Sequence, residues 1–171
     1  MIIWLLPIVF MIHDFEEIIF FKSWMNKNRE YLRDKFPKIS KRFLLRLGNL
    51  STSAFALAVA EEFLLLSLIT SGSVFFDRYE LWLAVFMGFF VHLWIHLAQW
   101  IILKRYIPAI WTTFLALIYC NYALYEIIVN NIFQISEIVF WTIIGVGLVG
   151  VNLIFAHKLA EMFDKKQRME N

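Results

Sequence analysis

The sequence predicts an all-α membrane protein, a polytopic transmembrane bundle of about five helices with an interfacial helical segment after the first span. Of its 171 residues, 61% are apolar and 18% aromatic, far from the balance of a soluble domain. The apolar residues form long continuous blocks, which favour membrane helices over the short alternating segments of a membrane barrel. The blocks cover residues 2–22, 49–70, 80–103, 107–128 and 134–157. We treat residues 1–171 as a single transmembrane domain.

The first block is expected to stay attached to the chain. It has no basic flank before it and no small-residue cleavage site after it, and carboxylates interrupt its centre, so it does not resemble a signal peptide. The polar segment 22–48 follows it and predicts an interfacial helix broken near Pro37. In this helix Trp24, Phe36 and the leucines within 43–47 are expected to face lipid headgroups.

The positions of Lys and Arg predict how the bundle is oriented. Segment 22–48 holds nine of them, 104–105 two and the tail from 158 onward four, whereas 71–79 holds one and 129–136 none. Basic loops are retained on the cytoplasmic side, so the amino terminus is expected outside and the carboxyl terminus in the cytoplasm, in a bacterial plasma membrane. The net charge of +2 follows from this topology, and no nucleic-acid partner is expected.

Polar residues interrupt three of the blocks at nearly the same depth. His13, Glu16 and Glu17 stand at i, i+3 and i+4, and His92 and His96 stand at i and i+4, so each set forms one stripe on its helix. The spans and their orientation were assigned from hydrophobicity and the basic loops only, so the shared depth independently supports one site near the bilayer centre.

The second block contributes adjacent glutamates to the same level. Glu61 and Glu62 diverge by about 100° around a helix, so only one of them can point straight into the site. Asp14 is similarly turned away from the stripe that begins at His13. The sequence leaves open which of the paired glutamates is used.

The balance of these charges favours a metal. Each ionised group in mid-membrane costs about 2.5–3.5 kcal/mol. No Lys or Arg lies within residues 2–21, 49–70, 81–103, 109–128 or 135–156 to pair with it. The species that could still neutralise the carboxylates are protons, histidinium ions and metal ions. Five acids face only three imidazoles, and one or two divalent cations would balance the excess negative charge. Mixed imidazole and carboxylate ligands suit zinc, iron or manganese. The candidate metal ligands are His13, Glu16, Glu17, Glu61, Glu62, His92 and His96.

Four short motifs resemble those of a known family. "HDFEE" at 13–17, "AEE" at 60–62, "HLWIH" at 92–96 and "YIP" at 106–108 are together similar to the HXXEE family of small polytopic membrane proteins. The resemblance implies no reaction, because that family is uncharacterised. Its members more often carry Gly after the proline, where this chain has Ala109, which implies a less tight turn into the fourth span.

The function expected from this site is that of a membrane metal-dependent, hydrolase-like enzyme acting on a lipid or isoprenoid-type substrate. Glu17 or Glu62 would carry the proton, as the catalytic residue. Two further enzymatic readings remain open: a redox di-iron enzyme, and a metal-independent intramembrane glutamate protease, although the arginine expected after the paired glutamates of such proteases is missing. A cation- or proton-coupled carrier or sensor would use the same residues, with a homo-oligomer supplying its symmetry. A non-catalytic accessory subunit would use them as assembly contacts.

Overall fold

The fold is a bundle of helices. The structure is a computed structural model, and it describes residues 2–37 and 48–170. Within them the chain forms a short 3-10 turn, η1, and five α-helices, with no strand. The elements are η1 (Ile2–Trp4), α1 (Leu5–Lys35), α4 (Thr52–Phe75), α5 (Glu80–Leu103), α6 (Ile110–Val129) and α7 (Ile135–Glu170). The predicted all-α bundle is confirmed.

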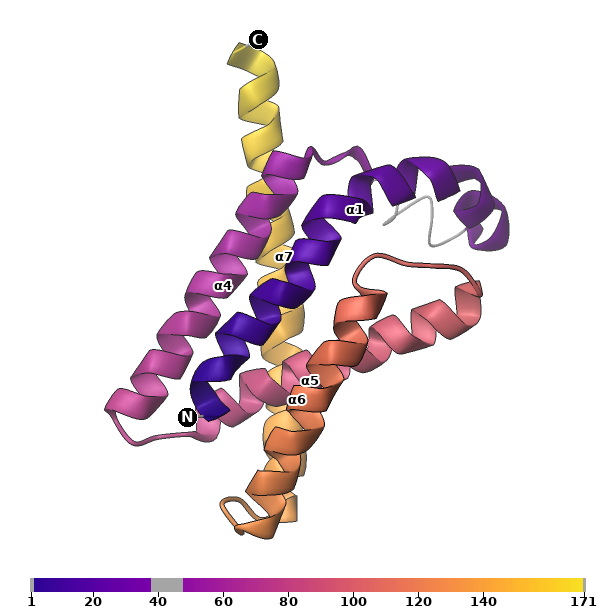
Figure 1. The fold of residues 1–171 in the computed structure, drawn as a ribbon. Helices are drawn as coiled ribbons and strands as arrows, with labels where there is room; N and C mark the ends of the chain where they lie inside the picture. The colour runs from indigo at the N-terminus through magenta and orange to yellow at the C-terminus, as the bar shows by residue number, and fades with distance from the viewer. Residues whose placement is uncertain (1, 38–47, 171) are drawn as a thin grey trace.

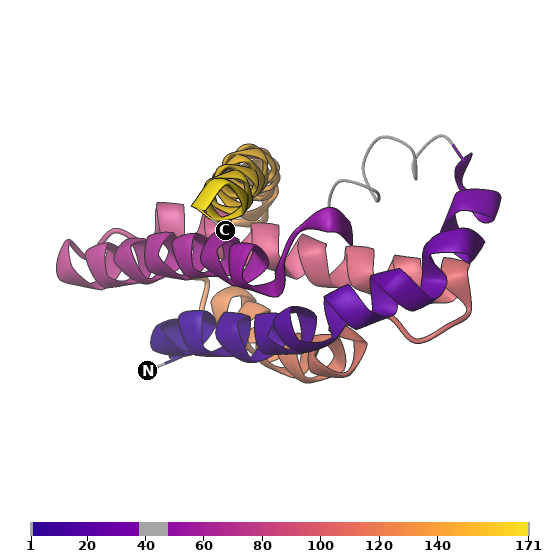
Figure 2. The same cartoon turned by 90° about the horizontal axis from the view of Figure 1, so that it is seen from above.

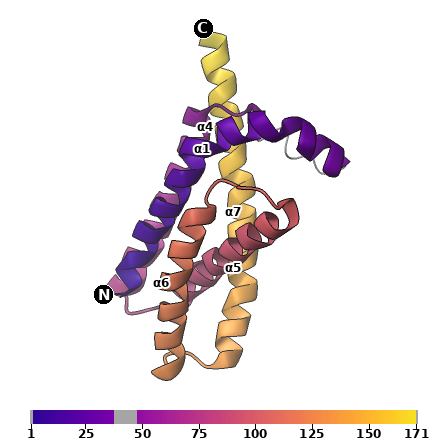
Figure 3. The ribbon, with the colours of Figure 1, turned by 45° about the vertical axis from the view of Figure 1, so that its right-hand side comes forward.

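The helices pack in three tiers. α4 and α5 contact each other in the middle; α7 packs on both of them from one side, and α1 and α6 lie on the other side, where α1 packs on α4 and α6 packs on both α5 and α1 (Figure 2). Figure 2 shows α7 nearly end-on beside this arrangement. Successive helices reverse direction, so the two termini lie at opposite ends of the molecule (Figures 1 and 3).

Four helices, α4, α5, α6 and α7, are long and apolar enough to cross a membrane, and the chain is accordingly a membrane protein. α1 does not meet the same standard, because Asp14, Glu16 and Glu17 interrupt its apolar stretch. The predicted boundaries of α5 agree with the structure. α7 runs to Glu170, well past the predicted end at residue 157.

α1 is one continuous helix that contains the first block and the start of the predicted interfacial segment. Its first half runs beside α4, and its second half turns away across the bundle (Figures 1 and 3). The helix ends at Lys35 because Pro37 disfavours helical backbone at the preceding residue, and Phe36 has φ −132°. Trp24 donates its indole N–H to the carbonyl of Tyr106 at 2.6 Å. The leucines within 43–47 lie outside the described residues.

Glycines let α5 and α7 cross closely. A Cβ on Gly145 would collide with the backbone carbonyl of Ala84, and one on Gly88 would lie 2.7 Å from the side chain of Val149. Larger residues at either glycine would force the two backbones apart. This close crossing fixes α5, which carries two of the predicted site histidines.

A second set of contacts joins the start of α4 to α7. The backbone N–H of Ser51 donates to Oδ2 of Asp164 at 2.9 Å, and the Ser51 hydroxyl donates to Oδ1 at 2.5 Å. The same hydroxyl accepts from the N–H of Ala54 at 3.0 Å, which caps α4. The extension of α7 beyond its predicted end is what carries Asp164 to this position.

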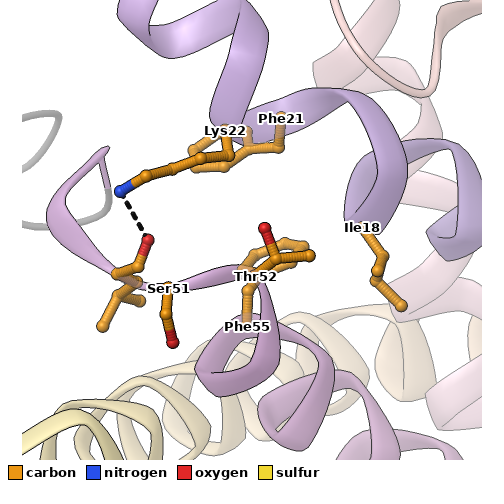
Figure 4. Close-up of a pocket in the computed structure, with 7 residues that line it drawn as sticks. Ile18, Phe21, Lys22, Ser51, Thr52 and Phe55 are labelled. Atoms are coloured by element: carbon orange, nitrogen blue, oxygen red, sulfur yellow. Dashed lines mark hydrogen bonds between the residues drawn. The ribbon is translucent and has the colours of Figure 1, made fainter.

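Lys22 ties α1 to the same segment. Its ammonium donates to the carbonyls of Gly48 and Leu50 at 2.8 and 2.7 Å, and Figure 4 shows it reaching across from α1 to the backbone before α4. The pocket between these elements measures about 10 Å³, which is room for about one water molecule. We call Lys22, Ser51 and Asp164 with their partners the Ser51 clasp.

Candidate metal centre

Four of the predicted site residues meet between α1 and α5. His13 and Glu17 of α1 and His92 and His96 of α5 each offer one ligand atom, and these four atoms lie within 4.8 Å of one another. The Nε2 atoms of His92 and His96 are 2.9 Å apart, and Nε2 of His96 is 3.2 Å from Oε1 of Glu17. Because the two residues of each helix are one turn apart, both helices direct their polar side chains to the same place. We call these four residues the His/Glu cluster.

The cluster lies largely inside the protein. His13 is fully buried and His96 is 5% exposed, while Glu17 and His92 are half-buried. The ring of Phe89 packs edge-on against the His13 imidazole, with centroids 5.7 Å apart. Apolar walls of this kind lower the local dielectric and strengthen any interaction between the cluster and a cation.

The donor atoms of the cluster fit a divalent cation. Nε2 of His13 is buried and has no hydrogen-bond partner among the described residues. A buried polar atom without a partner is costly, and an imidazole lone pair is satisfied equally well by a metal ion. Three imidazoles and one carboxylate without a thiolate suit zinc, iron or manganese. The cluster could therefore hold a metal.

Glu16 is not in the cluster, although the sequence made it a candidate ligand. Its Oε1 accepts from the hydroxyl of Tyr106 at 2.8 Å, and its Oε2 accepts from the N–H and the hydroxyl of Thr112 at 2.9 and 2.8 Å. These donors direct the carboxylate toward the start of α6. Thr112 was not predicted from the sequence, and the nearby "YIP" motif was the only signal in its neighbourhood.

The paired glutamates of α4 diverge as the helix geometry predicts. Oε2 of Glu61 accepts from the side-chain amide of Asn152 at 3.2 Å, so Glu61 is directed at α7. Glu62 interacts electrostatically with Glu17 and with Asp14 across the α1–α4 interface. Glu62 is therefore the member of the pair on the side of the His/Glu cluster, and neither glutamate is among its four residues.

The chain belongs to the HXXEE family. The family model described as "Protein of unknown function with HXXEE motif" matches residues 4–124, which include all four motifs and the whole His/Glu cluster. No curated protein matches the chain, and no solved structure matches it.

Proposed function

We propose that this protein is a membrane-embedded, metal-dependent enzyme, hydrolase-like in its chemistry, that acts on a lipid or isoprenoid-type substrate. The observation that carries the proposal is the convergence of three imidazoles and one carboxylate within 4.8 Å in a helical membrane protein. Ionisable groups inside membrane proteins are costly and mark functional sites, and this set has no lysine or arginine of its own to neutralise it.

The position of each side chain would set its role in catalysis. His13, Glu17, His92 and His96 would hold the cation. A divalent cation there would polarise an ester or phosphoryl oxygen as a Lewis acid. Glu62 would accept and return the proton, because it is close enough to interact electrostatically with Glu17 and does not belong to the cluster.

The substrate class follows from the surroundings of the cluster. Phe20 on α1 and Ile95 on α5 stand three residues after Glu17 and His92, on the same helix faces, and are about half exposed. In a membrane these surfaces contact acyl chains. A substrate that reaches the half-buried Glu17 and His92 through them must itself be largely apolar, as lipids and isoprenoids are.

The adjacent glutamates of α4 provide the test. Protein purified without chelators is expected to carry a stoichiometric divalent metal by elemental analysis. Turnover is measured on farnesyl and acyl esters and on phosphatidylglycerol in mixed micelles. Glu62→Gln should keep the metal and lose turnover, because the amide keeps the shape and carries no proton. Glu61→Gln is the matched control, one residue away and bonded to Asn152, and should stay active.

Two results would overturn the proposal. Equal activity of the Glu62→Gln and Glu61→Gln variants would remove the proton-carrying role of Glu62. A metal-free wild type that is stabilised only by protons at low pH would replace the enzyme with a proton-coupled carrier or a carboxyl-based acid catalyst.

A further inference from the structure

Thr112, at the start of α6, lies between Glu16 and His13 and contacts both. Its hydroxyl oxygen is 2.8 Å from Oε2 of Glu16 and 3.4 Å from Nδ1 of His13. The same oxygen also lies 3.3 Å from the His13 carbonyl and 3.1 Å from that of Ala109. No other side chain outside the His/Glu cluster forms a hydrogen bond with an imidazole of that cluster, among the described residues.

A count of protons decides the direction of these contacts. A threonine hydroxyl has one proton to donate and two lone pairs that accept. The carboxylate is the nearest acceptor, and a hydrogen bond to a charged oxygen is the strongest available to the hydroxyl, so the proton goes to Glu16. A lone pair is then left facing Nδ1 of His13, and this pairing is favourable only when Nδ1 carries the imidazole proton.

The consequence lies at the other ring nitrogen. With the proton on Nδ1, Nε2 of His13 presents its lone pair, and Nε2 is the buried atom that has no hydrogen-bond partner among the described residues. The ring of His13 lies 5.5 Å from that of His92 and 5.0 Å from that of His96, centroid to centroid. The free lone pair on Nε2 therefore belongs to the imidazole of His13, which lies beside the two imidazoles of α5.

We propose that Thr112 is a positioning residue that couples Glu16 to His13 and holds the His13 imidazole in the tautomer whose Nε2 can bind a metal. The proposal rests on the metal centre proposed above. It gives Glu16, which the sequence suggests as a ligand, a different role: its negative charge orients the threonine hydroxyl. Tyr106 supports this role, because its hydroxyl occupies Oε1 and leaves Oε2 to Thr112.

Metal affinity provides the first test, with Co²⁺ as the probe. Thr112→Val keeps the side-chain shape without the hydroxyl and should weaken Co²⁺ binding about 10–100-fold, as is usual for residues that orient a metal ligand. Thr112→Ser keeps the hydroxyl and should bind within about threefold of the wild type by the same argument. Thr113→Val is the matched control, because the adjacent Thr113 hydroxyl is buried and has no partner among the described residues. It should leave the affinity unchanged.

A double-mutant cycle tests whether Glu16 and Thr112 act together on Co²⁺ binding or independently. If Glu16 acts on His13 through Thr112, Glu16→Gln should weaken Co²⁺ binding in the wild type and add little in the Thr112→Val background. Additive losses would mean that the two residues act independently, and that result would overturn the coupling.

The tautomer can be measured without any metal. The ¹⁵N shifts of the His13 imidazole, in metal-free wild type, should report a proton on Nδ1, and Thr112→Val should move population to the Nε2–H form. A proton on Nε2 in the wild type would overturn the proposal even if every variant failed to fold. Tight Co²⁺ binding that is equal in the wild type and Thr112→Val would also overturn it. A wild type that binds no Co²⁺ would refute the metal centre, and the tautomer would still decide the role of Thr112.

Discussion

The Ser51 clasp and the His/Glu cluster both place charged groups between helices, but only the clasp has protein groups that balance its charges. In the clasp, Asp164 accepts two hydrogen bonds from Ser51, and Lys22 donates to two carbonyls. Burial alone would raise the pKa of Asp164, but the hydrogen bonds from Ser51 and the charges of Arg168 and Lys22 hold that pKa below its ordinary value. The clasp therefore supplies its own counter-charges.

The His/Glu cluster lacks such internal compensation. Its carboxylate, Glu17, is paired with an imidazole, His96, and not with a lysine or arginine. Nε2 of His13 has no partner among the described residues, and the nearby carboxylate of Asp14 also has an unpartnered oxygen. The comparison teaches that buried charge alone does not mark a functional site. An incomplete set of partners distinguishes the cluster, and an external cation would complete it.

The largest effect is expected from removing a histidine of the cluster. His96→Ala should lower Co²⁺ affinity by more than ~100-fold, beyond the loss typical of an orienting residue, and abolish the rise in Tm that added metal gives the wild type. Isothermal titration and thermal unfolding in detergent measure both. His157→Ala is the matched control, a histidine outside the cluster, and should bind Co²⁺ normally. Equal losses in the two variants would mean that the cluster is not the metal site.

The clasp should respond to pH and not to metal. Asp164→Asn should cost about 1–2 kcal/mol at neutral pH, because a hydrogen-bonded carboxylate is lost, and should leave Co²⁺ affinity unchanged. The folded pKa of Asp164 is lowered, so its contribution is complete above the unfolded value of about 3.9 and is lost as the pH falls through the folded value. The Tm difference between the wild type and Asp164→Asn should therefore vanish in acid. A constant difference down to about pH 2, well below the ordinary pKa of an aspartate, would show that the charge of Asp164 does not stabilise the fold.

The sequence predicts the cluster better than the clasp for a physical reason. His92 and His96 are one turn apart, and Glu17 follows His13 by one turn, so helix geometry alone fixes their common faces. The divergence of Glu61 and Glu62 follows from the same rotation per residue. The hydrophobic pattern that marks the helices also predicts the fold class.

Contacts between distant segments could not be predicted in this way. Glu16 is on the same stripe as His13, yet its partners Tyr106, in the turn before α6, and Thr112, in the first turn of α6, are ninety or more residues away. Asp164 reaches Ser51 only because α7 continues past the end of its apolar block. Hydropathy marks where a helix can cross a membrane and not where it ends. The orientation of the bundle and the identity of any metal stay predictions.

A smaller effect is expected from the unpartnered hydroxyl of Thr113, which is adjacent to Thr112 on α6. Thr113→Val removes a fully buried polar atom that has no hydrogen bond among the described residues and should stabilise the protein by about 1 kcal/mol. Ser51→Ala, in the clasp, should instead destabilise it, because the Ser51 hydroxyl caps α4. Thermal unfolding of both variants measures the contrast. A destabilised Thr113→Val would show that its hydroxyl has a partner.

The smallest effect concerns backbone strain next to the cluster. Ala109 precedes α6 with φ 69° and ψ 2°, a left-handed conformation that costs an L-residue about 1–2 kcal/mol and glycine nothing. The turn that the sequence suggested would be looser is thus held in a conformation that favours glycine. Among the described residues, the left-handed non-glycine positions are Asp77, Lys104, Ala109 and Asn131, and none is in the clasp.

Ala109→Gly should relieve this strain. Part of the gain is offset by the lost methyl, which is fully buried, and by the greater freedom of glycine in the unfolded chain, so a net stabilisation of about 0.5 kcal/mol is expected. The matched control is Ala116→Gly, at a buried position inside α6 with ordinary helical backbone, and it should destabilise by about 1 kcal/mol. Chemical denaturation of both variants measures the opposite signs. Equal destabilisation would show that the backbone at Ala109 is not strained. Unchanged Co²⁺ affinity in Ala109→Gly would further show that Thr112, three residues on, is positioned by its contacts with Glu16 and His13 and not by the strained turn.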